Sequence, residues 1–166
     1  MTPNGRIEMD AAQLATLKAA IAADVTLNAF PQNSDGAFEI ADALNQEASP
    51  AFYVWRTSYT PQQMRAAMCV NLGTAQLDAL TAAKRDALLW FIGDTLNPSD
   101  PAIISTIQDF CGSQNTLKAS LVDGAKRKAK RVEKILATGT GALATPATPT
   151  FEGSVSYQDV MQARSS

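Results

Sequence analysis

The sequence contains no histidine and only two cysteines among its 166 residues. Without histidine, the chain cannot form a Ser-His-Asp or Cys-His catalytic group, a histidine general base, or the usual Cys/His zinc site. Cys69 and Cys111 are too few for a disulfide framework, so each is predicted to be a small buried hydrophobic residue. Most familiar hydrolase mechanisms are therefore excluded, and we expect no enzyme activity, no cofactor and no metal.

Long apolar runs are also missing. No stretch approaches the roughly 18 consecutive apolar residues of a membrane span, and residues 1–10 lack the basic-then-apolar order of a signal peptide. The composition is 46% hydrophobic and 18% charged, which is typical of one soluble domain. We expect a product of the cytoplasm with no membrane partner.

Apolar residues recur at helical spacing along most of the chain. This periodicity predicts a mainly α fold, a compact bundle of about six helices. Thr60 and Gln63 form a possible capping box, and proline stands at the first helical position twice, at Pro61 and Pro101. The most apolar helix is expected to begin at Thr74, to pack Trp90 into its broad stripe, and to form the centre of the core. The helices are predicted to begin near Asp10, Ser34, Pro61, Thr74, Asp100 and Asn115.

The composition changes after residue 137. Residues 138–166 are rich in glycine, proline, serine and threonine, so we predict a helical body over 1–137 and an extended C-terminal arm over 138–166. Within the arm, Phe151, Val155 and Tyr157 alternate with small or polar residues, which predicts a short β-strand. Such a strand needs a partner edge, supplied either by the body or by another chain. These three residues are therefore candidate partner-binding residues.

A basic cluster is the clearest local signal. The last helix is predicted over 115–136, where seven basic and two acidic groups give a charge of +5 and leave −7 for the remaining chain. Three sources of counter-charge remain open: the acidic residues of 1–60, an acidic partner, or nucleic-acid phosphate. A solvated face near a helix C-terminus is the simpler interpretation. The candidate partner-binding residues on this basic helix are Lys126, Arg127, Lys130, Arg131 and Lys134.

An aromatic segment precedes the helix at Pro61. Phe52, Tyr53 and Trp55 lie in a loop-like stretch, where large rings either plug the bundle or meet a partner. The sequence does not separate these two cases. Glu39 and Asp42 lie three residues apart on one predicted helix, but nothing indicates a desolvated acid/base pair there.

Eight short runs of the sequence stand out: Gly124 to Arg127, Val132 to Lys134, Ala137 to Gly141, Pro146 to Thr148, Phe151 to Gly153, Ser156 to Val160, Trp55 to Thr57 and Ser34 to Ala37. Together they resemble a family of small tailed-bacteriophage proteins encoded among head and neck genes. Proteins of that family are structural. The head-to-tail adaptor class has a similar build, a small helical bundle that forms a ring beneath the portal and grips neighbours with an extended terminal arm.

The resemblance implies a virion protein at the head-tail junction, made in the host cytoplasm. It implies a homo-oligomeric ring that contacts portal and tail or neck proteins, with possible non-specific contact to packaged DNA. The alternatives are a head-decorating or tail-completion protein, and an assembly chaperone or regulator that is not part of the virion.

Overall fold

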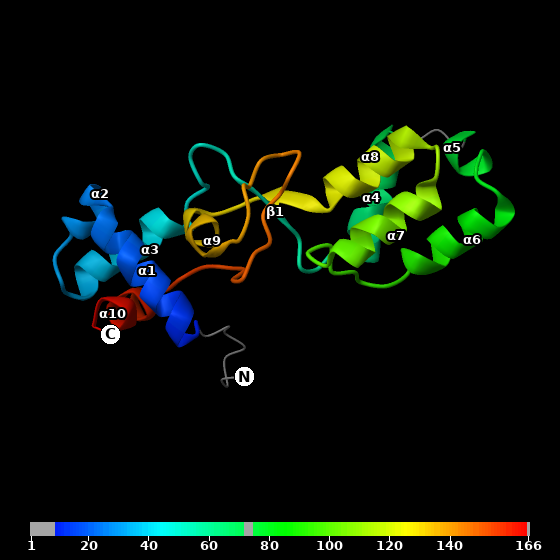
Figure 1. Cartoon of the computed structure of the whole chain (residues 1–166). Helices are drawn as coiled ribbons and strands as arrows, with labels where there is room; N and C mark the ends of the chain where they lie inside the picture. The colour runs from blue at the N-terminus through cyan, green and yellow to red at the C-terminus, as the bar shows by residue number, and fades with distance from the viewer. Residues whose placement is uncertain (1–8, 72–74, 166) are drawn as a thin grey trace. The chain divides into compact units, whose positions relative to one another are not determined.

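The computed structural model describes residues 9–71 and 75–165, and within these ranges the chain forms ten helices and one two-stranded sheet (Figure 1). The predicted mainly α class is confirmed. The chain divides into two compact units. Unit 1 joins the residues up to Phe52 with those from Lys128 onward, and unit 2 comprises Tyr53–Arg127.

Unit 1 contains five helices whose ends are fixed by short-range caps. The Asp10 side chain accepts a hydrogen bond from the Gln13 amide at 2.8 Å, and the Gln13 side chain accepts one from the Asp10 amide at 3.0 Å. Asp24 both ends the first helix and caps the second. The helices of unit 1 are α1 (Ala11–Ala23), α2 (Val25–Asn28), α3 (Ser34–Asn45), α9 (Arg131–Leu136) and α10 (Tyr157–Ser165).

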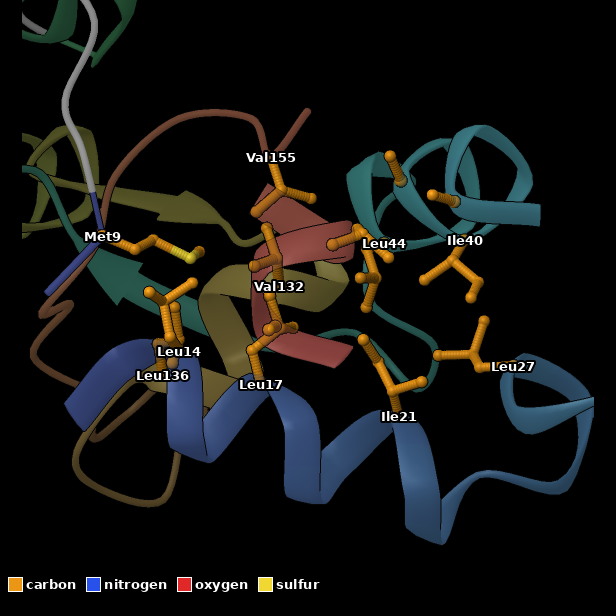
Figure 2. Packing of buried hydrophobic residues seen from close by; sticks show 14 of the residues in the cluster. Met9, Leu14, Leu17, Ile21, Leu27, Ile40, Leu44, Val132, Leu136 and Val155 are labelled. Carbon is orange, nitrogen blue, oxygen red and sulfur yellow. The ribbon is translucent and has the colours of Figure 1, made fainter. Parts of the chain in front are cut away.

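The core of unit 1 is assembled from both ends of the chain. Figure 2 shows side chains from α1, α3, α9 and the C-terminal segment converging on one apolar interior. Burial of this apolar surface is the main force that holds the distant segments together. The buried members include Leu14, Leu17, Ile21, Ile40, Leu44, Val132, Leu136, Phe151, Val155, Val160 and Ala163.

Unit 2 is a helical module that the chain enters and leaves through paired strands. The strand β1 (Tyr53–Trp55) pairs with β2 (Lys126–Lys128), whose last residue already belongs to unit 1. Both predicted proline starts are confirmed, and Thr60 and Gln63 form the expected capping box. The helices of unit 2 are α4 (Pro61–Asn71), α5 (Ala75–Asp78), α6 (Ala82–Phe91), α7 (Pro101–Cys111) and α8 (Asn115–Gly124).

The core of unit 2 differs from the sequence prediction in two places. The helix expected from Thr74 is divided, because the Thr81 side chain caps the Lys84 amide and starts α6 as a new helix. Leu88 and Ile92 face inward, and Trp90, on the opposite side of the helix, is exposed, so the prediction that Trp90 packs in a central core helix is wrong. Cys111 is buried as predicted, but Cys69 lies on the exposed side of α4, since that helix turns Met64 and Met68 inward.

The helix predicted over 115–136 is interrupted. Between α8 and α9, residues 126–128 form β2, which pairs with β1, and Lys130 forms an antiparallel bridge with Glu47, so long-range backbone pairing replaces helical hydrogen bonds. The Arg56 amide donates to the Ala125 carbonyl at 2.9 Å, and the Arg131 amide donates to the Gln46 carbonyl at 2.9 Å. The helix α8 ends at Gly124, where a Cβ would overlap the Tyr59 hydroxyl.

The C-terminal segment is part of unit 1. The predicted boundary between residues 137 and 138 is not where the structure divides, and the strand predicted around Phe151, Val155 and Tyr157 does not form. Residues 151–156 are irregular, and Tyr157 begins α10. The period-two pattern instead reflects an irregular chain that buries Phe151 and Val155 against α1, α3 and α9, whose apolar faces require a cover.

Candidate interaction surfaces

The basic segment, defined here as residues 126–134, is neutralised in large part by the chain itself. Lys126 forms an ion pair with Asp123 at 2.8 Å, and Lys128 forms one with Glu47 at 3.3 Å. Arg131 forms an ion pair with Asp24. Two of these three counter-charges therefore come from the acidic first part of the sequence. That part was one of the three sources of counter-charge that the sequence analysis left open.

The remaining bases of the segment also have contacts within the chain. The Lys130 ammonium donates to the Ser154 hydroxyl at 2.6 Å, and the Lys134 ammonium lies 5.8 Å from the centre of the Phe52 ring. Arg127 is half-buried. Some of these basic residues lie on β2 and others on or next to α9. Their side chains therefore do not form the single helix face that the sequence predicted. A role of these bases in binding a partner stays a prediction.

Asp24 shows how closely this network is coupled to the fold. Its pKa lies below the ordinary value of 3.8, first because the Leu27 amide donates to the carboxylate, and also because Arg131 lies beside it. Partial burial opposes this shift. The carboxylate thus acts both as a helix cap and as the anionic partner of Arg131.

The aromatic segment is directed into the fold. Phe52, Tyr53 and Trp55 are all half-buried. The Phe52 ring lies so close to Gly141, where φ is +67°, that a Cβ there would overlap it. Trp55 packs against the core of unit 2, with the Lys126 ammonium 5.9 Å from its ring centre. Phe52 and Trp55 therefore pack within the fold, and a role of the three rings in binding a partner stays a prediction.

The candidate residues of the predicted arm are occupied within unit 1. Phe151 and Val155 are buried, and the Tyr157 ring stacks on Phe38 with the ring centres 4.1 Å apart. Phe151 and Val155 therefore have no free surface to offer a neighbouring subunit.

Two other exposed faces were not singled out by the sequence. The first, the Trp90 face, lies on unit 2 and consists of Asp86, Leu89 and Trp90 on α6 together with Gly93 just after this helix. The Trp90 side chain is 76% exposed and Leu89 is 48% exposed. The signal in the sequence was the helical register itself, because Leu88 and Ile92 together fix the buried side of α6 and place Trp90 opposite it.

The second, the Phe38 face, lies on unit 1 and consists of Asp35, Phe38, Glu39, Asp42 and Met161. Phe38 is 55% exposed and Met161 of α10 is 44% exposed. The three carboxylates are exposed, and no ion pair links them to a base among the residues that the structure describes. The spacing of 35, 38, 39 and 42 on one side of α3 could have been read from the sequence.

A shallow hollow adjoins the Phe38 face. It has a volume of about 160 Å³ and is lined by Gln32, Asn33, Ala37, Met161, Arg164 and Ser165. The Arg164 guanidinium is held by the Phe30 and Pro31 carbonyls at 3.1 Å each. This side of unit 1 therefore combines exposed apolar groups with a recess and a rim of charge.

Metal-ligating side chains do not cluster in the part of the chain that the structure describes. Residues 9–71 and 75–165 contain no group of three or more Cys, Asp or Glu side chains placed to hold a metal ion. None of the helices described is both long and apolar enough to cross a membrane. Glu39 and Asp42 lie on the exposed side of α3.

Comparisons with known proteins give no match: no family model, no curated protein and no solved structure is similar to this chain.

Proposed function

We propose that this chain is a structural subunit of a tailed-bacteriophage virion, a ring-forming connector that docks on the portal at the head-tail junction. The proposal starts from the resemblance of the C-terminal third, and of shorter runs near residues 34 and 55, to small head and neck proteins. The mainly helical build agrees with the adaptor class. A similar fold alone does not show a similar function. The proposal therefore also needs support from a surface feature of this chain.

That feature is the pair of exposed aromatic faces. A ring subunit needs two different surfaces, one for each neighbour. The chain has the Trp90 face on unit 2 and the Phe38 face on unit 1, each centred on a large exposed ring. Exposed large apolar groups rimmed by polar residues are typical of protein interaction sites.

The proposal differs from the sequence-based expectation in how neighbours are held. Phe151 and Val155 belong to the core of unit 1, so gripping a neighbour is assigned to the two exposed faces instead of the C-terminal segment. The basic segment remains a second candidate surface toward portal or packaged DNA, since Lys128 keeps about half of its side chain exposed.

The deciding experiment is whether the protein is a component of purified virions. Quantitative mass spectrometry of particles purified on a density gradient should detect this chain at a fixed copy number relative to the portal protein. Immunogold labelling should place it at the head-tail junction. Absence from the particles would overturn the proposal and favour the assembly chaperone or regulator. Labelling distributed over the whole head would favour a decoration protein.

A further inference from the structure

We propose that a hollow beside Arg131 and Lys134 in unit 1 binds a phosphoryl group. The hollow has a volume of about 340 Å³, at the lower end of the range of small-molecule sites. The phosphoryl group belongs either to a free phosphate or to a nucleic-acid backbone, and the test below separates these two sources. The inference does not depend on the proposed connector function.

Two cations line the hollow, and both keep unused hydrogen-bond donors. They lie three residues apart on α9 and therefore on one side of this helix. The Arg131 guanidinium has five N–H groups, and its ion pair is with Asp24. The Lys134 ammonium lies over the Phe52 ring and forms no ion pair with an acid in the part of the chain that the structure describes.

A hydroxyl group adds a third kind of donor. Ser49 lines the same hollow, and within residues 9–71 and 75–165 its side chain has no hydrogen-bond partner. Arginine, lysine and serine are side chains that commonly contact phosphate oxygens. A phosphoryl group has three strong acceptor oxygens and up to two negative charges, whereas a carboxylate has two oxygens and one charge. The set of donors therefore suits a phosphoryl group better.

The one acid that lines the hollow does not cancel its positive charge. Asp24 Oδ1 accepts from the amides of Thr26 and Leu27 at 3.0 Å each, and Oδ2 accepts from Arg131. Both carboxylate oxygens are thus engaged within the chain. Two bases and one acid leave the lining of the hollow with a net charge of +1.

The walls of the hollow strengthen a charged contact. Leu27 and Ala48 are buried, Ile135 is half-buried, and all three line it. Because apolar walls reduce the screening by water, a hydrogen bond to an anion is stronger here than on an open surface.

The test is isothermal titration calorimetry of the full-length chain with inorganic phosphate, at an ionic strength held constant with chloride. Phosphate should bind saturably at one site. Lys134→Gln should weaken this binding about tenfold, because one charged hydrogen bond is lost. Asp24→Asn should tighten it about two- to fivefold, because Arg131 is released from its ion pair and a negative charge beside the ligand is removed. Loss of fold cannot produce tighter binding.

A matched control is Lys128→Gln, which removes the same charge from the same basic segment. Lys128 pairs with Glu47 and does not line the hollow, so this variant should bind phosphate like the unchanged chain. Circular dichroism should show the same helical signal in all variants.

A short DNA duplex in place of phosphate identifies the source of the phosphoryl group. A duplex that binds, and that Lys134→Gln weakens as much as it weakens phosphate, indicates a nucleic-acid backbone. A duplex that does not bind, while phosphate does, indicates a free phosphate or a small phosphate ester.

The inference is overturned if inorganic phosphate does not bind at millimolar concentrations, or if Lys134→Gln binds it like the unchanged chain. It is also overturned if Lys128→Gln weakens binding equally, since that result would mean a diffuse attraction to the basic segment. None of these results decides whether the chain is a virion component, because the analysis of purified particles tests that proposal separately.

Discussion

The side chain of Asn45 binds the backbone of Val155 at both of its polar groups. The Asn45 amide nitrogen donates to the Val155 carbonyl at 2.8 Å, and the Val155 amide donates to the Asn45 side-chain oxygen at 2.9 Å. One side chain thus imitates the backbone of a neighbouring strand. The Asn45 side chain on α3 thus provides the hydrogen-bond donor and acceptor that a neighbouring strand would otherwise offer to the irregular segment before α10. These two bonds explain how a glycine- and proline-rich stretch becomes part of a packed unit.

Replacing Asn45 with alanine should destabilise unit 1 by about 1–3 kcal/mol, because both polar groups of Val155 lose their partner in a partly buried position. Hydrogen exchange at the Val155 amide should accelerate in proportion. The matched control is Gln46→Ala, whose exposed side chain is adjacent in sequence. Equal exchange rates in the two variants would show that the Asn45 bonds contribute nothing to holding the segment.

Truncation after Gly141 should unfold unit 1 and leave unit 2 folded. The cut removes Phe151, Val155 and Val160 from the core of unit 1, while the core of unit 2 contains no residue beyond Ala125. Both tryptophans, Trp55 and Trp90, belong to unit 2. Tryptophan emission should therefore stay native while the helical signal in circular dichroism falls. Retention of the helical signal of unit 1 would instead restore the independent C-terminal arm that the sequence predicted.

Local signals were sufficient to predict most helix starts. Asp10 with Gln13, Thr60 with Gln63, and Asp100 before Pro101 each fix a helix start through bonds that span only a few residues. Such caps act before any tertiary contact is made, so they can be read from neighbouring letters.

The interruption at β2 could not be predicted in the same way. Its cause is the chain at 46–56, about seventy or more residues away in the sequence, whose backbone forms hydrogen bonds with that of residues 125–131. The apolar pattern at Leu117, Leu121 and Ala125 continues at Ala129 and Val132, and it is as suitable for a continuous helix as for the observed break. For the same reason the in-chain partners of the basic segment were only one of three alternatives. The exposure of Trp90, in contrast, could have been predicted, because Leu88 and Ile92 fix the buried side of α6 and Trp90 lies opposite them.

The ion pair between Asp24 and Arg131 should make unit 1 sensitive to acid. Asp24→Asn keeps an oxygen that can accept from Thr26 and Leu27 but removes the negative charge, so it should cost about 0.5–1 kcal/mol at pH 7. The lowered pKa of Asp24 means that the unfolded chain takes up this proton first. Its stabilising effect is therefore present above about pH 4 and is lost as the pH falls through the native pKa.

Urea unfolding followed by circular dichroism from pH 7 down to pH 3 should show the two curves of stability against pH converging in acid. Asp42→Asn is the matched control, because that carboxylate is exposed and has no ion pair among the described bases. A gap between Asp24→Asn and the unchanged chain that persists undiminished at pH 3 would mean that charge is not the origin of the effect.

A pH effect at the alkaline end should come from Tyr59 in unit 2. Its ring is fully buried, and its hydroxyl has no hydrogen-bond partner within the part of the chain that the structure describes. Burial raises the pKa of this phenol to about 12, while the nearby Arg56 opposes the shift. Since the unfolded chain loses the Tyr59 proton near pH 10 and the native chain does not, the contribution of Tyr59 to stability is complete below pH 10 and declines as the pH rises toward 12.

Tyr59→Phe should therefore have two effects on unit 2. At neutral pH it should be equally stable or more stable by about 1 kcal/mol, because an unpartnered buried hydroxyl is removed without loss of volume. Between pH 10 and pH 12 the unchanged chain should lose about 2–3 kcal/mol of its free energy of unfolding through the ionisation of Tyr59, and the variant should not show this loss. Urea unfolding followed by tryptophan emission measures unit 2 directly, and Tyr53→Phe, which retains Tyr59, should keep the alkaline loss.

The same hydroxyl explains why residue 124 must be glycine. A Cβ at this position would overlap the Tyr59 hydroxyl and contact Ala67 closely, so Gly124→Ala should destabilise unit 2 by about 1–3 kcal/mol. The cost should be smaller when Gly124→Ala is combined with Tyr59→Phe, because the overlapping oxygen is gone, although the contact with Ala67 remains. A double-mutant cycle read by tryptophan emission tests this coupling. Additive costs of the two substitutions would contradict the close approach of α8 to Tyr59 on which the argument depends.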